Sequence, residues 1–234
     1  LVGGPSLEQV MDGERPGPWS PEDALVVMLP VISAVAHAHE RQVLHRDLKP
    51  GNILLTSVAG ANHYVKVVDF GLVRQLGDAA DVGLTGEGSI LGTPRYLAPE
   101  SIKGGATVDG RADLYALGAL MFQMLTGRLP FSCESPVELV TMHLTEPAPA
   151  PSLFVDGLPA PLEALVLNLL EKKPCDRPPS ALAVRDQLKG FQSTLQDLPA
   201  TPRGEVDGKV EVTTGSAPAH AGSEAHTMLS HPTL

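Results

Sequence analysis

The sequence predicts a mainly α-helical fold of the α+β class that contains one small β-hairpin. Apolar residues recur at helical spacing in several segments, and two short apolar runs are separated by a turn-like stretch. The chain has 234 residues, which is enough for one or two domains with a real core. Its 23 glycines and 22 prolines indicate long connections between the regular elements.

A long helix is expected from Pro21 to about Arg41. Ser20 is a candidate N-cap, Pro21 would occupy the first helical position, and Glu22 and Asp23 place carboxylates in the first turn. The apolar stripe consists of Ala24, Val27, Met28, Val31, Ile32, Val35 and Ala36. The apolar stretch is shorter than the roughly 20 residues that span a bilayer and contains a proline, so no transmembrane segment is expected.

The hairpin and the later helices follow in order. The strands are expected at Asn52–Leu55 and Tyr64–Val68, joined by a loop that contains Gly and Asn. Helical patterns return at Ala112–Thr126, Pro136–His143, Leu162–Glu171 and Pro179–Phe191.

The last part of the chain differs in composition. Residues 192–234 contain no aromatic residue and are rich in Thr, Pro, Gly, Ala and Ser. Such a segment buries too little apolar surface to offset its ordering entropy. We therefore expect a folded domain over residues 1–191 and a disordered low-complexity tail over residues 192–234.

Charge and cysteine content exclude several function classes. The net charge of −10 and the pI near 5.2 argue against nucleic-acid binding, because phosphates would be repelled on average. Two cysteines, Cys133 and Cys175, cannot form a disulfide-dense scaffold or a four-cysteine zinc site. We interpret them as reduced thiols of a cytoplasmic protein, with one isolated bridge as the alternative.

Polar residues crowd into residues 44–52, Leu-His-Arg-Asp-Leu-Lys-Pro-Gly-Asn, between the long helix and the first strand. Another polar residue, Asp69, comes directly after the second strand, within residues 68–71, Val-Asp-Phe-Gly. Polar residues in such turns are usually capping groups, and Asp-Phe-Gly alone is a common tripeptide. A capping role therefore stays open for each segment taken separately.

Together, the two segments resemble the catalytic loop and the magnesium loop of the eukaryotic-type (Hanks-type) protein kinases. Three further matches follow in the family's order: Gly92–Glu100, Asp113–Gly118 and Cys175–Pro178. The lysine in Asp-Leu-Lys-Pro is typical of kinases that act on Ser and Thr, and the Pro- and Ala-rich style resembles bacterial members. The resemblance covers about residues 1–190 and implies the large C-terminal lobe of the kinase fold, from the interlobe hinge onward.

The resemblance implies a role for each residue of the catalytic segment. Asp47 would act as base and orient the substrate hydroxyl, and Lys49 would meet the γ-phosphate of ATP as a flexible charge. Asn52 and Asp69 would hold Mg²⁺, which prefers oxygen ligands. ATP and Mg²⁺ are thus the implied cofactors, and proteins are the implied substrates.

Other positions are implied to build the surroundings of the nucleotide. Leu54 would form the floor beneath the adenine, and Ser6 would face the ribose. His45 and Phe70 would stack beneath the site, followed by Gly71 of the same magnesium loop.

Three more residues are implied to be architectural. Asp113, at the start of the central helix, would accept backbone hydrogen bonds from the catalytic loop. Glu100 and Arg177 would form a buried ion pair that ties the end of the activation segment to the last helices.

A Gly-rich segment over residues 71–98 contains Thr85, Ser89 and Thr93. Loops of this length are uncommon unless they are functional. Arg46, directly before the candidate base, resembles the arginine that meets an activation-loop phosphate in one kinase subclass. We expect phosphorylation at Thr85 or Ser89 to order this segment, Thr93 to pack beside the catalytic residues, and a homodimer to serve autophosphorylation.

The family's small lobe is not recognisable in the sequence. Its phosphate-pairing lysine has no counterpart, because the first lysine of the chain is Lys49, and residues 1–4 are too short for its Gly-rich loop. We expect that the sequence begins late within a longer kinase and that the isolated chain transfers little phosphate. The alternative is a non-catalytic, kinase-like module that binds partners; the intact catalytic and magnesium residues favour the kinase.

Overall fold

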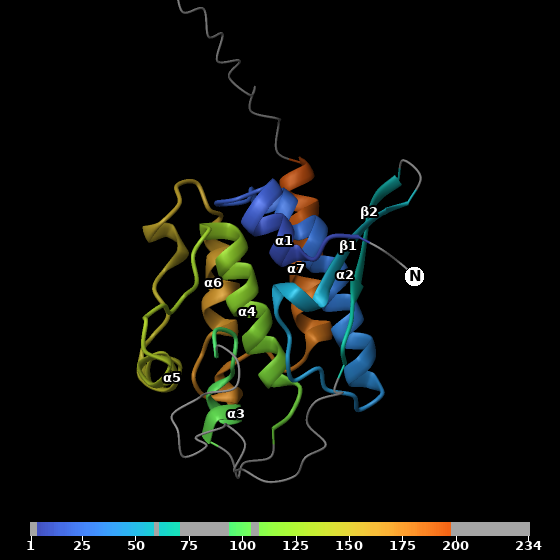
Figure 1. The fold of residues 1–234 in the computed structure, drawn as a ribbon. Helices are drawn as coiled ribbons and strands as arrows, with labels where there is room; N and C mark the ends of the chain where they lie inside the picture. Colours follow the sequence, from blue (N-terminus) through green and yellow to red (C-terminus); the bar gives the residue numbers. More distant parts are fainter. Residues whose placement is uncertain (1–3, 59–60, 71–93, 104–107, 198–234) are drawn as a thin grey trace, which may run out of the picture. The chain divides into compact units, whose positions relative to one another are not determined.

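A nearly completely buried helix, α4 (Arg111–Thr126), forms the centre of the folded unit in the computed structural model (Figure 1). The structure describes residues 4–58, 61–70, 94–103 and 108–197. The chain divides into a first unit, Leu1–Leu198, and a second unit, Pro199–Leu234, which lies outside the described residues. Because α4 is apolar around most of its circumference, other elements pack on several of its sides.

The long helix α2 (Pro21–Glu40) packs against α4, the second strand and the last helix α7 (Ala181–Asp197). Its bounds confirm the expected helix, and the Ser20 hydroxyl accepts a hydrogen bond from Asp23 N at 3.2 Å. By length and composition α2 is apolar enough to cross a membrane, a result that the shorter apolar stretch in the sequence did not predict. Its stripe is buried within the fold, however, so core packing accounts for its apolar character.

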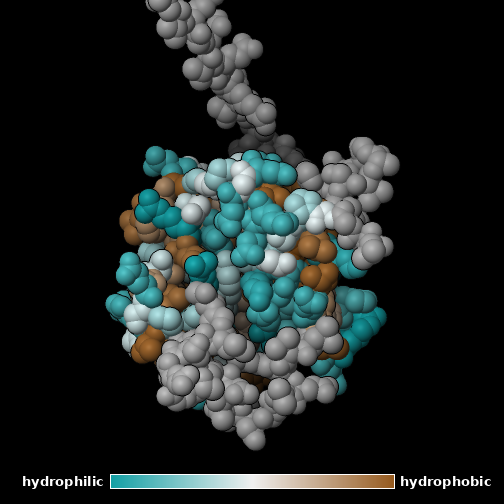
Figure 2. All heavy atoms as spheres, viewed as in Figure 1, coloured by the Kyte–Doolittle hydropathy of each residue, from teal (hydrophilic) through white to brown (hydrophobic). Residues whose placement is uncertain are grey.

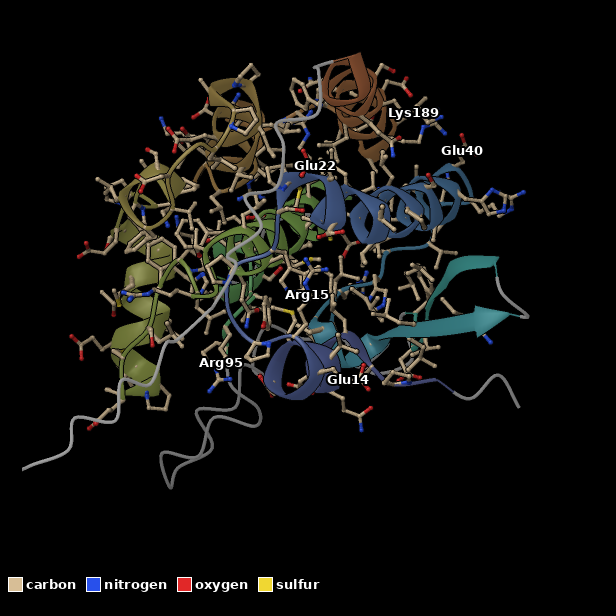
Figure 3. All side chains as sticks on the ribbon, turned by 90° about the horizontal axis from the view of Figure 1, so that it is seen from above. Glu14, Arg15, Glu22, Glu40, Arg95 and Lys189 are labelled. Carbon is tan, nitrogen blue, oxygen red and sulfur yellow. The ribbon has the colours of Figure 1, made fainter. Side chains whose placement is uncertain are left out.

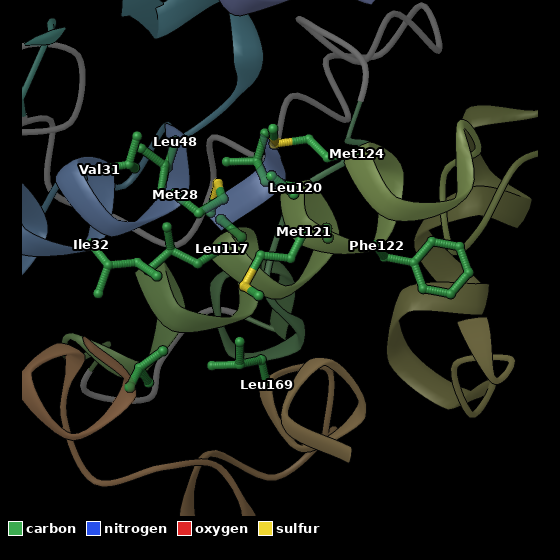
Figure 4. Close-up of a cluster of buried hydrophobic side chains, with 14 of the residues drawn as sticks. Met28, Val31, Ile32, Leu48, Leu117, Leu120, Met121, Phe122, Met124 and Leu169 are labelled. Carbon is green, nitrogen blue, oxygen red and sulfur yellow. The ribbon is translucent and has the colours of Figure 1, made fainter. Parts of the chain in front are cut away.

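Side chains from three helices meet in the core (Figure 4). Met28 of α2 and Leu117 of α4 lie in this cluster together with Leu169 of α6 (Ala160–Leu169), and each is fully buried. Gly118 allows α4 and α6 to approach closely, because a Cβ atom at this position would lie 2.7 Å from the Leu169 Cβ. A side chain at position 118 would therefore push the two helices apart.

The predicted hairpin is present as β1 (Ile53–Val58) and β2 (Ala61–Val67), which pair antiparallel in register Ile53 with Val67. It lies beside α2, on the side of α4 opposite α5 (Pro136–Thr145) in Figure 1. Both strands extend further toward the turn than the apolar runs indicated, because the backbone pairing continues to Val58 and Ala61.

The segment before α2 contains regular structure that the hydrophobic pattern did not predict. The short helix α1 (Leu7–Gln9) continues into a π-helix, η1 (Val10–Glu14). A capping box starts α1: the Ser6 hydroxyl accepts from Gln9 N at 3.2 Å, and the Gln9 side chain accepts from Ser6 N at 2.9 Å. The buried Leu7 fixes this segment to the core.

Helical segments complete the C-terminal half: α3 (Pro99–Lys103), α5, η3 (Pro151–Leu153), α6, η4 (Pro174–Asp176) and α7. Helix α7 begins after Ser180, whose hydroxyl accepts from Ala183 N at 3.2 Å, and not at Pro179 as the sequence indicated. It ends at Asp197, beyond the boundary at 191 that we expected for the folded domain. Helix α6 begins at Ala160 and ends at Leu169, earlier at both ends than predicted.

Hydrophilic residues cover most of the described surface in the view of Figure 2. Glu14 and Glu40 lie at the outer edge of the side-chain view in Figure 3, whereas Arg15 lies between η1 and α2. The Arg15 guanidinium pairs with Asp23, and its Cζ lies 4.5 Å from the centre of the Trp19 ring.

Cys133 and Cys175 are both free thiols.

One histidine is buried inside this helical scaffold. His143 of α5 is 0% exposed; its Nδ1 lies 2.9 Å from the Tyr115 hydroxyl, and its ring centre lies 5.1 Å from that of Phe131. Burial, together with the nearby Lys172 ammonium, lowers the pKa of His143 from 6.5 to about 4. The folded protein therefore holds this side chain neutral.

This burial predicts a pH dependence of stability. Between pH 6.5 and pH 4 the unfolded chain binds a proton at His143 that the folded chain does not, so stability falls as the pH falls through this window, by about 3 kcal/mol at most. Urea unfolding followed by the fluorescence of Trp19 should show a smaller loss from pH 6.5 to 4.5 in His143→Gln than in the original chain. Equal losses in both proteins would contradict the prediction.

Candidate active site

The Asp113 carboxylate organises the candidate catalytic segment from the start of α4. It is 2% exposed, and its two oxygens accept hydrogen bonds from His45 N and Arg46 N, each at 2.8 Å. A charge this deeply buried is stable only when its oxygens are satisfied. The backbone at residues 45 and 46 is therefore tied to the central helix.

A third group reaches the same carboxylate. His39, near the C-terminal end of α2, places its Nε2 2.8 Å from Asp113 Oδ2. Gly110 makes room for the imidazole, because a Cβ atom there would lie 2.7 Å from His39 Nδ1. Nothing in the local sequence pattern indicates this contact, since the two partners lie more than seventy positions apart.

Asp47, Lys49 and Asn52 come together in the loop that Asp113 holds. Lys49 Nζ lies 2.7 Å from Asp47 Oδ2, and Asn52 Nδ2 donates to the same oxygen at 3.2 Å and to the Asp47 carbonyl at 2.7 Å. The Asp47 and Lys49 side chains are about half exposed, at 52% and 45%, so both remain accessible from solvent. Asn52 is 7% exposed and is held firmly by these bonds.

The end of β2 brings Asp69 to this loop. The residue before it, Val68, donates from its backbone N to Asn52 O at 2.9 Å, and its carbonyl lies 2.9 Å from His45 Nε2. Asp69 has a φ of 61°, a left-handed conformation that L-residues rarely adopt. Two bonds to Val68 thus fix the strained turn that presents the Asp69 carboxylate.

The residues next to Asp47 and Asp69 in the sequence also have defined positions. The rings of His45 and Phe70 lie 4.7 Å apart between centres. Arg46 also has a left-handed backbone, with a φ of 64°, directly before Asp47. Backbone strain of this kind clusters at functional sites, where the surrounding structure holds it in place.

Glu100 of α3 and Arg177 form a buried, two-pronged ion pair. Arg177 donates to Glu100 Oε1 at 2.7 Å and to Oε2 at 2.8 Å, and the two side chains are 0% and 9% exposed. The guanidinium also donates to the carbonyls of Arg111 at 2.8 Å and Glu171 at 2.7 Å. This pair joins α3, the start of α4 and the turn before α7.

A second polar contact anchors residues 94–98 to α4. Tyr96 donates its hydroxyl proton to Gln123 Oε1 at 2.6 Å, and burial raises the pKa of this phenol. Gln123 is one of the few α4 residues that are not buried. Sequence reasoning did not single out this pair.

The positions implied for nucleotide binding lie at the hairpin. Leu54 of β1 pairs with Lys66 of β2. It also forms an isolated bridge with Ser6, so Ser6 and Leu54 lie side by side at one edge of β1. The Ser6 hydroxyl caps α1, and its contact with a ribose stays a prediction. Gly71, Thr85, Ser89 and Thr93 lie outside the described residues.

The donor set fits a hard divalent cation. Asn52 uses its amide nitrogen toward Asp47, which leaves the amide oxygen as its possible metal ligand. Asp69 adds an exposed carboxylate close in sequence to the Val68–Asn52 hydrogen bond. Carboxylate and amide oxygens are the ligands that Mg²⁺ accepts in proteins.

Comparison with known proteins identifies this arrangement. The sequence profile described as "Protein kinase domain" matches residues 1–188. The chain belongs to the protein kinase family. Its kinase-family fold is mostly helical with a small two-stranded sheet in the described residues.

The relatives are serine/threonine kinases of bacteria. The chain is 38% identical over 208 residues to serine/threonine-protein kinase pkn3 of Myxococcus xanthus, covering 86% of this chain and 37% of that protein. It is 36% identical over 187 residues to PknB of Mycobacterium tuberculosis, covering 80% and 29%. The crystal structure of the Mycobacterium tuberculosis PknI kinase domain matches with a TM-score of 0.59 at 29% identity, covering 81% of this chain and 63% of that one.

These values identify a serine/threonine protein kinase domain similar to those of bacterial kinases. The chain spans only about three tenths to two fifths of the length of these curated relatives. Their wider architecture therefore does not transfer to it.

The Glu100–Arg177 pair predicts a large loss of stability when one partner is removed. Glu100→Gln leaves the Arg177 guanidinium buried without its counter-charge, which should cost about 3 to 5 kcal/mol in the free energy of unfolding. Urea unfolding measures this cost. The exposed Glu138→Gln serves as the matched control and should change stability by about 0.5 kcal/mol or less.

A double variant tests the cause of this loss. Combining Glu100→Leu with Arg177→Met removes both charges and should be less destabilising than Glu100→Gln alone. If the double variant is the less stable protein, an uncompensated charge is not the reason for the loss.

Proposed function

We propose that this chain is the catalytic large lobe of a protein serine/threonine kinase, which transfers the γ-phosphate of ATP to the hydroxyl of a protein substrate. One observation carries the proposal: Lys49 and Asn52 both donate hydrogen bonds to the same carboxylate oxygen, Oδ2 of Asp47. A module that only binds partners has no physical need for this arrangement of acid, cation and amide. The family membership supports the same reaction class.

Asp47 orients the substrate hydroxyl and accepts its proton. Both of its side-chain contacts within the described part of the chain fall on Oδ2, so Oδ1 is the oxygen that accepts from the substrate. The Asn52 bond to the Asp47 carbonyl holds the residue's backbone in position. Such positioning supplies most of the catalysis in phosphoryl transfer, where little covalent chemistry falls to the protein.

Lys49 changes partner during the reaction. In the structure its ammonium pairs with Asp47, and it is close to half exposed. A flexible lysine stem can turn toward the transferring phosphate while keeping its charge near the base. It thereby offsets the negative charge that the phosphate brings to the site.

Asn52 and Asp69 hold Mg²⁺ through oxygen atoms. The bound ion supplies charge neutralisation on the phosphates of ATP. The hydrogen bond from Val68 N to Asn52 O keeps the two ligands' backbones together before any nucleotide binds. Leu54 and Ser6 lie at the same edge of β1, where they meet the adenine and the ribose.

In the protein kinase family the phosphate-pairing lysine and the Gly-rich loop belong to a small lobe. The chain contains no lysine before Lys49. Without that lobe the 234-residue chain binds ATP weakly and transfers little phosphate. Phosphorylation at Thr85 or Ser89, read by Arg46 and carried out within a homodimer, completes the proposed activation.

Joining residues 1–197 to the small lobe of a bacterial serine/threonine kinase tests the function. The chimera should phosphorylate a general acceptor protein with Mg·ATP, and Asp47→Asn should reduce the rate by at least about 100-fold because it removes the base. The unfused chain is the control and should show negligible transfer. A chimera that folds and binds Mg·ATP but is equally inactive with Asp47 or Asn at this position would favour the partner-binding alternative.

A further inference from the structure

Lys172 lies in the turn between α6 and η4 and directs its ammonium group at the C-terminal end of α5. Nζ donates to His143 O at 3.0 Å and to Met142 O at 3.3 Å. The same nitrogen lies 4.2 Å from the centre of the Phe131 ring and 5.8 Å from that of Tyr115. A single cation therefore contacts two helix carbonyls and two aromatic rings.

Helix α5 buries little of its own surface in the described part of the chain. Of its ten residues, only Leu139 and His143 are buried. The Ser135 hydroxyl caps its N-terminus, but the last carbonyls of a helix have no partners within it. His143 lies in the last turn and is held neutral, so it adds no positive charge against the helix dipole.

We propose that Lys172 is a positioning residue for α5, a cation supplied by a neighbouring turn that fixes the last helical turn against the core. The proposal stands on the two carbonyl contacts, the ring contacts and the sparse burial of α5, and it does not depend on the proposed reaction. A positive charge is stabilised at a helix C-terminus by the helix dipole and over an aromatic face by the cation–π interaction.

Tyr115 links this contact to the ion pair of the active-site region. The Arg177 Cζ atom lies 5.0 Å from the centre of the Tyr115 ring, which Lys172 also contacts. The Tyr115 hydroxyl in turn bonds to His143 of α5. The Tyr115 ring thus contacts both α5 and the buried Glu100–Arg177 pair.

The geometry implies a dependence on pH. Burial, and secondarily Arg177, lowers the pKa of Lys172 from 10.5 to about 8, while Glu146 and Glu171 oppose this shift. Around Lys172, His143 is neutral and burial raises the pKa of the Tyr115 phenol, so Lys172 is the group that titrates near pH 8. At and below pH 7 Lys172 is therefore charged, and the charged form is the one that holds α5.

The lowered pKa sets the sign of any response to higher pH. Between pH 8 and 10.5 the unfolded chain binds the lysine proton more tightly than the folded chain, so this group makes the folded state more stable as pH rises. The same sign applies to a local opening of α5 that exposes Lys172, so the contact is tested with variants at one pH below 8.

Amide hydrogen exchange of the 234-residue chain tests the proposal. The reporter is the Glu146 amide, which donates to Met142 O at 2.9 Å; the internal reference is the Leu139 amide at the other end of α5, which donates to Ser135 O at 2.9 Å. At pH 7, where Lys172 is charged, Lys172→Met should lower the protection of Glu146 relative to Leu139 roughly tenfold. No change in this ratio would overturn the proposal.

Three variants sharpen the test. Lys172→Met keeps the aliphatic stem and should lower the Glu146 protection at pH 7, with an unchanged or higher urea midpoint. Lys172→Arg keeps the charge and should retain the protection at the same pH. The adjacent, exposed Lys173→Met should behave as the original chain. Faster exchange throughout the domain with a lower midpoint in Lys172→Met, or unchanged exchange at Glu146, would overturn the proposal.

Discussion

The Asp113 carboxylate is the group on which the candidate active site depends. It is buried at the start of the central helix and receives the backbone of His45 and Arg46 and the imidazole of His39. The buried charge requires these donors, and the donors in turn determine where the following loop begins. The convergence of Asp47, Lys49 and Asn52 and the Asn52–Val68 bond follow from that fixed starting point.

Buried polar contacts connect the remaining parts of the helical scaffold. Hydrophobic packing brings α2, α4, α6 and α7 together but does not determine how short segments such as α3 and α5 are attached. The Glu100–Arg177 pair attaches α3, and the contacts of Tyr115, His143 and Lys172 attach α5. Because these contacts share one aromatic ring, the two attachments form a single cluster.

Much of this organisation could be predicted from the sequence, and the exceptions have physical causes. The helix after Ser20 and the hairpin follow from periodicity, and the motif order indicated the contacts of Asp113 and Arg177 that the structure contains. The π-helix after α1 and the His39–Asp113 contact have no periodic signal, since each depends on tertiary packing. The Ser-x-x-Gln spacing at Ser6 is that of a capping box, whereas the kinase resemblance implied a ribose contact for the same residue.

The most direct test of the account is amide hydrogen exchange of the chain carrying Asp113→Asn. This variant preserves size and places an NH₂ group against the backbone donors, so one of them loses its acceptor. The amide that loses its acceptor, at residue 45 or 46, should exchange at least about 100-fold faster, while the amides in the middle of α4 retain their protection. Unchanged exchange at residues 45 and 46 in a folded variant would contradict the claim that Asp113 holds the catalytic loop.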